Sequence, residues 1–96
     1  MSPLYNKKLR YIRSELDKLD KSLIKIIKKR TNLVKKVLTL KDKKNQIVDQ
    51  KRIRMILKNI RAKSIKNKID PKITHRIWKN MIMAYIDYEK RNFKKK

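Results

Sequence analysis

The sequence contains no glycine and no cysteine, and it has only one histidine, His75. The absence of cysteine excludes disulfides and cysteine-ligated metals, and a single histidine leaves little for a histidine-based metal site. No apolar run approaches the length of a membrane span. The first residues also lack the apolar segment of a signal peptide, so we expect the chain to work in the cytoplasm, away from membranes.

Acidic residues are scarce. The chain has eight Asp and Glu and 31 Lys and Arg, which gives a net charge of +23. Such a charge attracts nucleic acid non-specifically, and one hypothesis is that the partner is nucleic acid or an acidic molecule. The alternative is compositional drift, since Lys far exceeds Arg and Ile far exceeds Val, as in an A/T-rich coding sequence. Most lysines fall on the solvent side of the expected helices, and we favour drift.

The stretch from Leu9 to Lys41 carries one long apolar repeat. Read in sevens, its two rows are Leu9, Leu16, Leu23, Arg30 and Val37, and Ile12, Leu19, Ile26, Leu33 and Leu40. The pattern predicts one amphipathic helix about 50 Å long, whereas a chain of this size folded alone has a radius of gyration of about 12 Å. Much of the stripe therefore needs cover from another chain. We expect a single domain, residues 1–96, that forms an obligate homodimer.

The remainder of the chain predicts two shorter helices. A polar segment, residues 41–46, separates the long helix from a second helix over about residues 49–63, for which Asp49 is a good N-cap. The acid–proline pair Asp70-Pro71 marks the start of a third helix, which ends near Phe93. No segment alternates as a strand does, so the predicted fold class is all-α with three helices per chain, one long and two shorter.

Charged residues on the apolar faces are the candidates for chemistry. Arg30 is the one charge in the long stripe, where a guanidinium costs free energy unless it is paired. Lys41 lies almost three turns further on and points to nearly the same side, so the two cations could clamp a small dicarboxylate. Arg13 is too distant to join this gap within one chain, but it could reach a partner's gap in an antiparallel dimer. Glu89 falls on the buried side of the third helix.

Each of these residues also has a structural alternative. Arg30 could fix the register of packed helices, and Lys41 is favourable beside the carboxyl end of a helix. Asp49 could serve only as an N-cap, Glu89 could pair with a lysine at the rim, and Arg13 could be a plain surface residue. No single signal is specific, but together they place several cations and few acids around one gap lined by helices.

The order of these residues resembles the all-helical chorismate mutase family. The resemblance rests on the following runs and positions: Ile12-Arg13-x-x-Leu16-x-x-Leu19-Asp20, Arg30, Lys41, Asp49-x-x-Arg52 and Met81-Ile82-x-Ala84-Tyr85-Ile86-x-x-Glu89. It covers nearly the whole chain, and it implies an intertwined homodimer of three-helix chains with two equivalent active sites. The rearrangement of chorismate to prephenate in aromatic amino acid biosynthesis needs no metal or cofactor, so none is expected.

The resemblance also implies a role for each candidate residue. Arg30 would hold one substrate carboxylate, and Arg13, acting from the partner chain, would hold the other. Lys41 would donate to the ether oxygen that departs as the C–O bond breaks. Glu89 would face the same oxygen and would need a proton to donate, so the rate should fall as Glu89 ionises. The resemblance places Asp49 and Arg52 along the second-helix side of the pocket.

Two pocket positions depart from the typical mutase pattern. Ile53 stands where typical mutases have a glutamate that binds the ring hydroxyl, and Tyr85 stands where many have a small polar residue. Both look more like the related isochorismate pyruvate lyases of salicylate synthesis, whereas Asp49 looks mutase-like. We expect a chorismate mutase. Two alternatives stay open, an isochorismate pyruvate lyase and a non-catalytic basic helical dimer that binds nucleic acid or an acidic partner.

Overall fold

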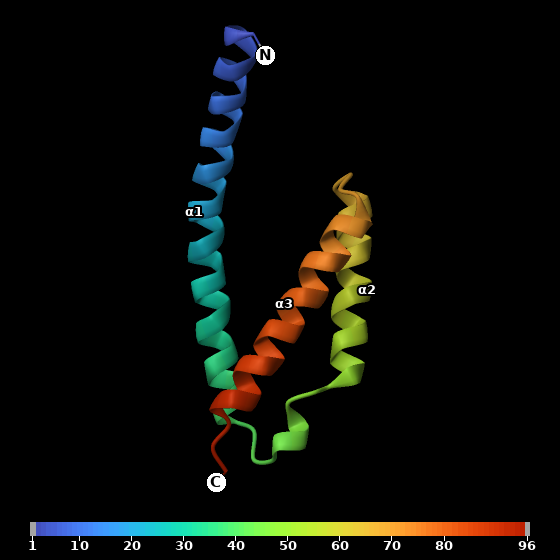
Figure 1. Cartoon of the computed structure of the whole chain (residues 1–96). Coiled ribbons are helices and arrows are strands. Elements are labelled where there is room, and N and C mark those ends of the chain that lie inside the picture. The colour runs from blue at the N-terminus through green and yellow to red at the C-terminus, as the bar shows by residue number, and fades with distance from the viewer. Residues whose placement is uncertain (1, 96) are drawn as a thin grey trace. The chain divides into compact units, whose positions relative to one another are not determined.

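The computed structural model describes residues 2–95, and they form an all-helical chain. Its elements are α1 (Pro3–Thr39), the one-turn 3-10 helix η1 (Lys44–Gln46), α2 (Gln50–Lys66) and α3 (Pro71–Asn92) (Figure 1). No strand occurs in the part of the chain that the structure describes. The prediction of three helices, one long and two shorter, is therefore confirmed. None of the helices in that part is long and apolar enough to cross a membrane.

The chain divides into two compact units, residues 1–33 and 34–96. The first unit is a single helical segment, the amino-terminal part of α1, which begins where the Ser2 hydroxyl accepts a hydrogen bond from the Tyr5 N–H at 3.1 Å. Its apolar row is exposed within this one chain. Between 52% and 65% of the surface is accessible at these residues: Ile12, Leu16, Leu19, Leu23 and Ile26. A helix that exposes such a row has no core of its own, so its stability depends on being covered.

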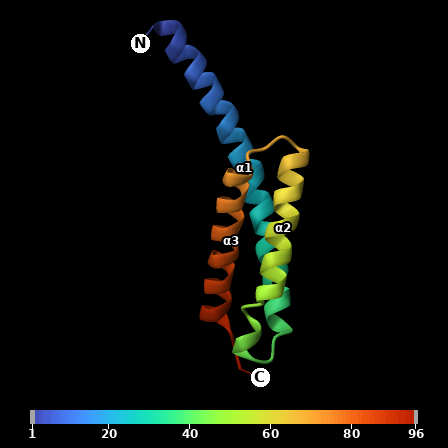
Figure 2. The same ribbon diagram turned by 90° about the vertical axis from the view of Figure 1, so that its right-hand side faces the viewer.

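The second unit holds the end of α1, η1 and an antiparallel hairpin of α2 and α3 (Figure 2). The hairpin is joined by a hydrogen bond of 2.6 Å between the hydroxyl oxygens of Ser64 and Thr74. Ser64 is only 3% exposed, and this bond, together with a bond to the Ile60 carbonyl, satisfies a hydroxyl that would be costly to bury without partners. Among the described residues, the buried apolar side chain is that of Ile47, just before α2. Its burial anchors the loop that leads into the hairpin.

The helix starts follow the sequence closely. Asp49 caps α2 by accepting a hydrogen bond from the Arg52 N–H at 3.0 Å, and Asp70 caps α3 by accepting one from the Lys72 N–H at 2.9 Å. Pro71 occupies the first turn of α3, where its missing N–H costs nothing. The N-cap predicted at Asp49 and the helix start predicted at Asp70-Pro71 are both confirmed, because each acid precedes a turn whose N–H groups lack helical partners.

The end of α2 differs from the prediction, because the helix continues three residues beyond Lys63 to Lys66. Its end is a Schellman turn, in which the Ile69 N–H bonds to the Ser64 carbonyl and the Lys68 N–H to the Ile65 carbonyl. Lys68 adopts φ 57° there, a left-handed conformation that glycine takes without penalty. This segment is mostly polar, so apolar spacing did not predict that the helix continues through it.

Replacing Lys68 by glycine should stabilise the protein by about 1 kcal/mol, because the left-handed backbone then loses its Cβ penalty. The measurement is the free energy of unfolding in urea at one fixed protein concentration. Lys63→Gly, within the helix, is the matched control and should destabilise by about 0.5–1 kcal/mol. A loss of stability in Lys68→Gly would contradict the left-handed turn.

Candidate active site

An ion pair between Lys41 and Glu89 is the centre of the candidate site. The Lys41 ammonium donates to Glu89 Oε2 at 2.6 Å, and the side chains are 18% and 9% exposed. Lys41 lies just past the end of α1, and Glu89 lies in the last turns of α3. The pairing gives the nearly buried carboxylate a partner, without which its burial would be strongly unfavourable.

Glu89 is turned inward by the apolar periodicity of α3. Met81, Ile82 and Tyr85 lie at helical spacing before it, and all three are half-buried. A residue four positions after Tyr85 shares its face, so the carboxylate is carried to the buried side. The prediction that Glu89 faces inward is confirmed, and the structure also shows the pairing with a lysine that was one of its alternatives.

The second-helix candidates lie in the same unit as this pair. The Asp49 carboxylate is engaged as the cap of α2, and Asp49 and Arg52 are exposed, whereas Ile53 is half-buried. The structural alternative for Asp49 is therefore present in the folded chain. The contribution of Asp49, Arg52, Ile53 and Tyr85 to a substrate pocket stays a prediction.

Arg13 and Arg30 lie in the first unit, on α1, and both guanidinium-bearing residues are exposed. Arg30 is therefore not buried in this one chain. Its position in an apolar row would bury it only if another chain covered the helix. Exposed guanidinium groups are free of the desolvation cost and can bind a carboxylate through two parallel N–H donors. That these two arginines join Lys41 and Glu89 at one site stays a prediction.

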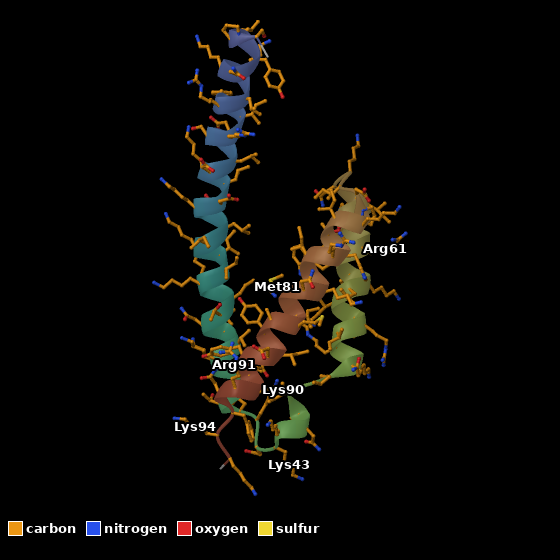
Figure 3. The ribbon with its side chains drawn as sticks, viewed as in Figure 1. Lys43, Arg61, Met81, Lys90, Arg91 and Lys94 are labelled. Atoms are coloured by element: carbon orange, nitrogen blue, oxygen red, sulfur yellow. The ribbon has the colours of Figure 1, made fainter. Side chains whose placement is uncertain are left out.

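The surroundings of the pair are cationic. Figure 3 shows Lys90, Arg91 and Lys94 at the carboxyl end of α3, next to the turn that holds Glu89. Arg91 forms an exposed ion pair with Asp87 at 2.8 Å. A positive rim of this kind draws anionic ligands toward the site. Lysine has three N–H donors, so Lys41 retains donors for a ligand oxygen while it is bound to Glu89.

A known protein family matches this arrangement along most of the chain. The family model described as chorismate mutase type II matches residues 12–90. The chain belongs to the chorismate mutase type II family. The match confirms the resemblance inferred from the sequence, and it runs from the Arg13 motif to just past Glu89. No curated protein and no solved structure matches the chain.

Membership in the chorismate mutase type II family supports an enzyme of the chorismate mutase class. The family match spans both Ile53 and Tyr85, the positions that separate a mutase from a lyase in the sequence argument. It supports the chemical class without distinguishing between these two activities.

The sequence reasoning missed a cationic hollow between α2 and α3, lined in part by Arg61 and His75. The signal that could have indicated it is the absence of acids along α2.

Replacing Lys41 by methionine should destabilise the protein by about 2 kcal/mol, because it leaves a nearly buried carboxylate without a cation. The double variant Lys41→Met/Glu89→Leu should lose much less than the sum of the single changes. The measurement is a double-mutant cycle of unfolding free energies. Lys44→Met, on the exposed η1, is the control and should change little; additive effects of the two pair substitutions would argue against the ion pair.

Proposed function

We propose that the chain is a chorismate mutase that converts chorismate to prephenate in aromatic amino acid biosynthesis. The observation that supports this most directly is the Lys41–Glu89 pair, at 2.6 Å, within a chain of the chorismate mutase type II family. It provides a fixed ammonium beside an acid, with no nucleophile needed. This is the chemistry that a unimolecular rearrangement of a dicarboxylate requires.

In the reaction, one C–O ether bond breaks as one C–C bond forms, and no atom leaves the substrate. Negative charge grows on the ether oxygen in the transition state. The Lys41 ammonium donates to that oxygen, and a prearranged donor of this kind is commonly worth about 100- to 1,000-fold in rate. Glu89 accepts a hydrogen bond from Lys41, and this ion pair holds the ammonium in place for that donation.

The two carboxylates of chorismate need a clamp that holds the substrate in its compact, reactive conformer. Arg30 holds one carboxylate, and Arg13 from a second copy of the chain holds the other, each through a bidentate pair. Such positioning removes entropy from the barrier before the reaction begins. Asp49, Arg52, Ile53 and Tyr85 form the remaining wall of this pocket.

The dimer in this proposal is supported by the exposed apolar row of the first unit. Side chains that expose more than half of their surface at five helical positions form a contiguous apolar patch, which is typical of an interaction surface. A second copy covers this row and at the same time carries its Arg13 to the partner's site. In a two-fold dimer the exchange is reciprocal, so both sites receive the same set of residues.

An isochorismate pyruvate lyase is the second candidate, and Ile53 is the observation that favours it. Ile53 is half-buried and apolar, so this position has no carboxylate to accept the ring hydroxyl of chorismate. Elimination of pyruvate from isochorismate breaks the same type of C–O bond, and the same clamp and the same Lys41 donor serve it. The two activities therefore differ in substrate rather than in machinery.

The test of function supplies chorismate and isochorismate side by side and follows prephenate, pyruvate and salicylate. We expect prephenate from chorismate, with a loss of about 100-fold or more in kcat/KM for Arg30→Ala and for Lys41→Ala. Lys29→Ala, next to Arg30 on α1, is the matched control and should stay near the parent rate. Salicylate and pyruvate as the main products would favour the lyase, and absence of turnover of both substrates would overturn the enzyme proposal.

Mixing two inactive variants tests whether Arg13 acts from the partner chain. Arg13→Ala and Arg30→Ala, each inactive alone, should recover about a quarter of the parent activity after subunit exchange, because each mixed dimer then has one intact site. The measurement is prephenate formation after refolding the two variants together. Recovery that stays at the level of the separate variants would place Arg13 and Arg30 in the same chain's site.

A further inference from the structure

The helix α2 carries seven cations and no acid over its seventeen residues, and the acid-free stretch continues to Ile69. Four of these cations, Lys51, Arg54, Lys58 and Arg61, are spaced by three, four and three residues. All four are exposed. At 100° per residue they fall within an arc of about 80° and extend about 15 Å along the helix. They form a single straight stripe of positive charge.

The stripe continues onto α3 across a hollow at the hairpin end. A hollow of ≈ 840 Å³ has cations from both helices in its lining. The lining residues are Arg61 from α2 and Pro71, Lys72, Ile73, His75, Arg76 and Ile77 from α3. A neighbouring hollow of ≈ 320 Å³ shares Arg61 and His75 with it and includes Lys58. Figure 3 shows Arg61 at this end, away from Lys90 near the candidate active site. We call these six residues the basic face: Lys51, Arg54, Lys58, Arg61, Lys72 and Arg76.

The charges of the basic face are not compensated within the described chain. The ion pairs Lys18–Glu15, Lys41–Glu89 and Arg91–Asp87 do not involve this face. The neighbouring acids Asp49 and Asp70 are occupied as helix caps. Compositional drift enriches lysine here, yet three of the chain's eight arginines lie on this face. Arginine supplies three of the six cations of this face, against eight of the 31 cations of the chain, and arginine binds phosphate through two parallel N–H donors.

We propose that the basic face binds the phosphate backbone of nucleic acid. Successive cations of the stripe lie about 4.5–6 Å apart along the helix, and a linear row of single charges complements a linear polyanion. The one aromatic side chain among the residues that line the two hollows is His75, and the six cations of the face contact phosphates rather than base edges. The binding is therefore independent of base sequence and strongly dependent on salt.

This inference is separate from the proposed enzyme activity, because none of the six residues belongs to the clamp or to the Lys41–Glu89 pair. The test measures fluorescence anisotropy of a labelled random-sequence DNA duplex with the full chain across a salt series. The variant Arg54→Gln/Lys58→Gln/Arg61→Gln removes three charges from the face. Its control, Lys21→Gln/Lys25→Gln/Lys28→Gln, removes three charges at the same spacing from α1.

The α2 triple variant should bind about 10-fold or more weakly than the parent chain, and its slope of log K against log salt should fall by about 2–3, because each lost phosphate contact removes roughly 0.9. The control slope should fall by less than about 1. Equal losses in the two triple variants would show that net charge alone governs binding, and would overturn the proposal. Equally tight binding of polyglutamate by the parent chain would also overturn it, in favour of an acidic protein partner.

A second variant keeps the test independent of folding. Arg54→Lys/Arg61→Lys conserves the charge of the face and should retain the parent salt slope within about 1. Far-UV circular dichroism at the helical minimum, roughly 222 nm, verifies that each variant keeps its helices. Loss of DNA binding in the charge-conserving variant, with its helices intact, would exclude a contact based on charge with phosphates.

Discussion

The burial of one carboxylate constrains the arrangement of the second unit. Glu89 is turned inward by the apolar periodicity of α3, and its charge has to meet a cation there. Lys41 provides that cation at 2.6 Å, which ties the segment after α1 to the last turns of α3. The loop, η1 and the hairpin then have to fit between these two fixed points. In the proposed enzyme the same contact presents an ammonium to the substrate.

The same pair has a consequence for the proposed enzyme. Glu89 accepts from Lys41, and this holds a flexible side chain in one geometry. In the proposed reaction the ether oxygen would take another N–H of this ammonium, and lysine has enough donors to keep both contacts. The ion pair would then fix the donor in advance, which is what electrostatic catalysis requires.

Local signals in the sequence predicted most of the fold. Asp49 and Asp70 mark helix starts because an acid can satisfy the N–H groups of a first turn, and both do so in the structure. The end of α2 was predicted three residues early, because its last turn is held by backbone bonds and by the Ser64 hydroxyl bond to the Ile60 carbonyl. Neither leaves an apolar pattern. The heptad row of α1 predicts the need for cover, whereas the identity of the covering chain depends on contacts between molecules.

For the site, the sequence predicted the inward face of Glu89 and offered a lysine as one possible partner. The residue pattern alone could not choose Lys41 from 23 lysines, whereas the family resemblance placed Lys41 and Glu89 at the same oxygen. Their direct contact depends on how the chain returns α3 to the end of α1. The hollow beside Arg61 was missed for the same reason, since it requires the packing of α3 on α2.

The Lys41–Glu89 contact also has a kinetic consequence. It closes a loop of 48 residues, which costs about 3 kcal/mol of chain entropy, against about 2 kcal/mol for the ten-residue closure between Ser64 and Thr74. The lower cost favours closing the hairpin first, so that a chain caught part-way through folding has its helices but lacks the Lys41–Glu89 pair.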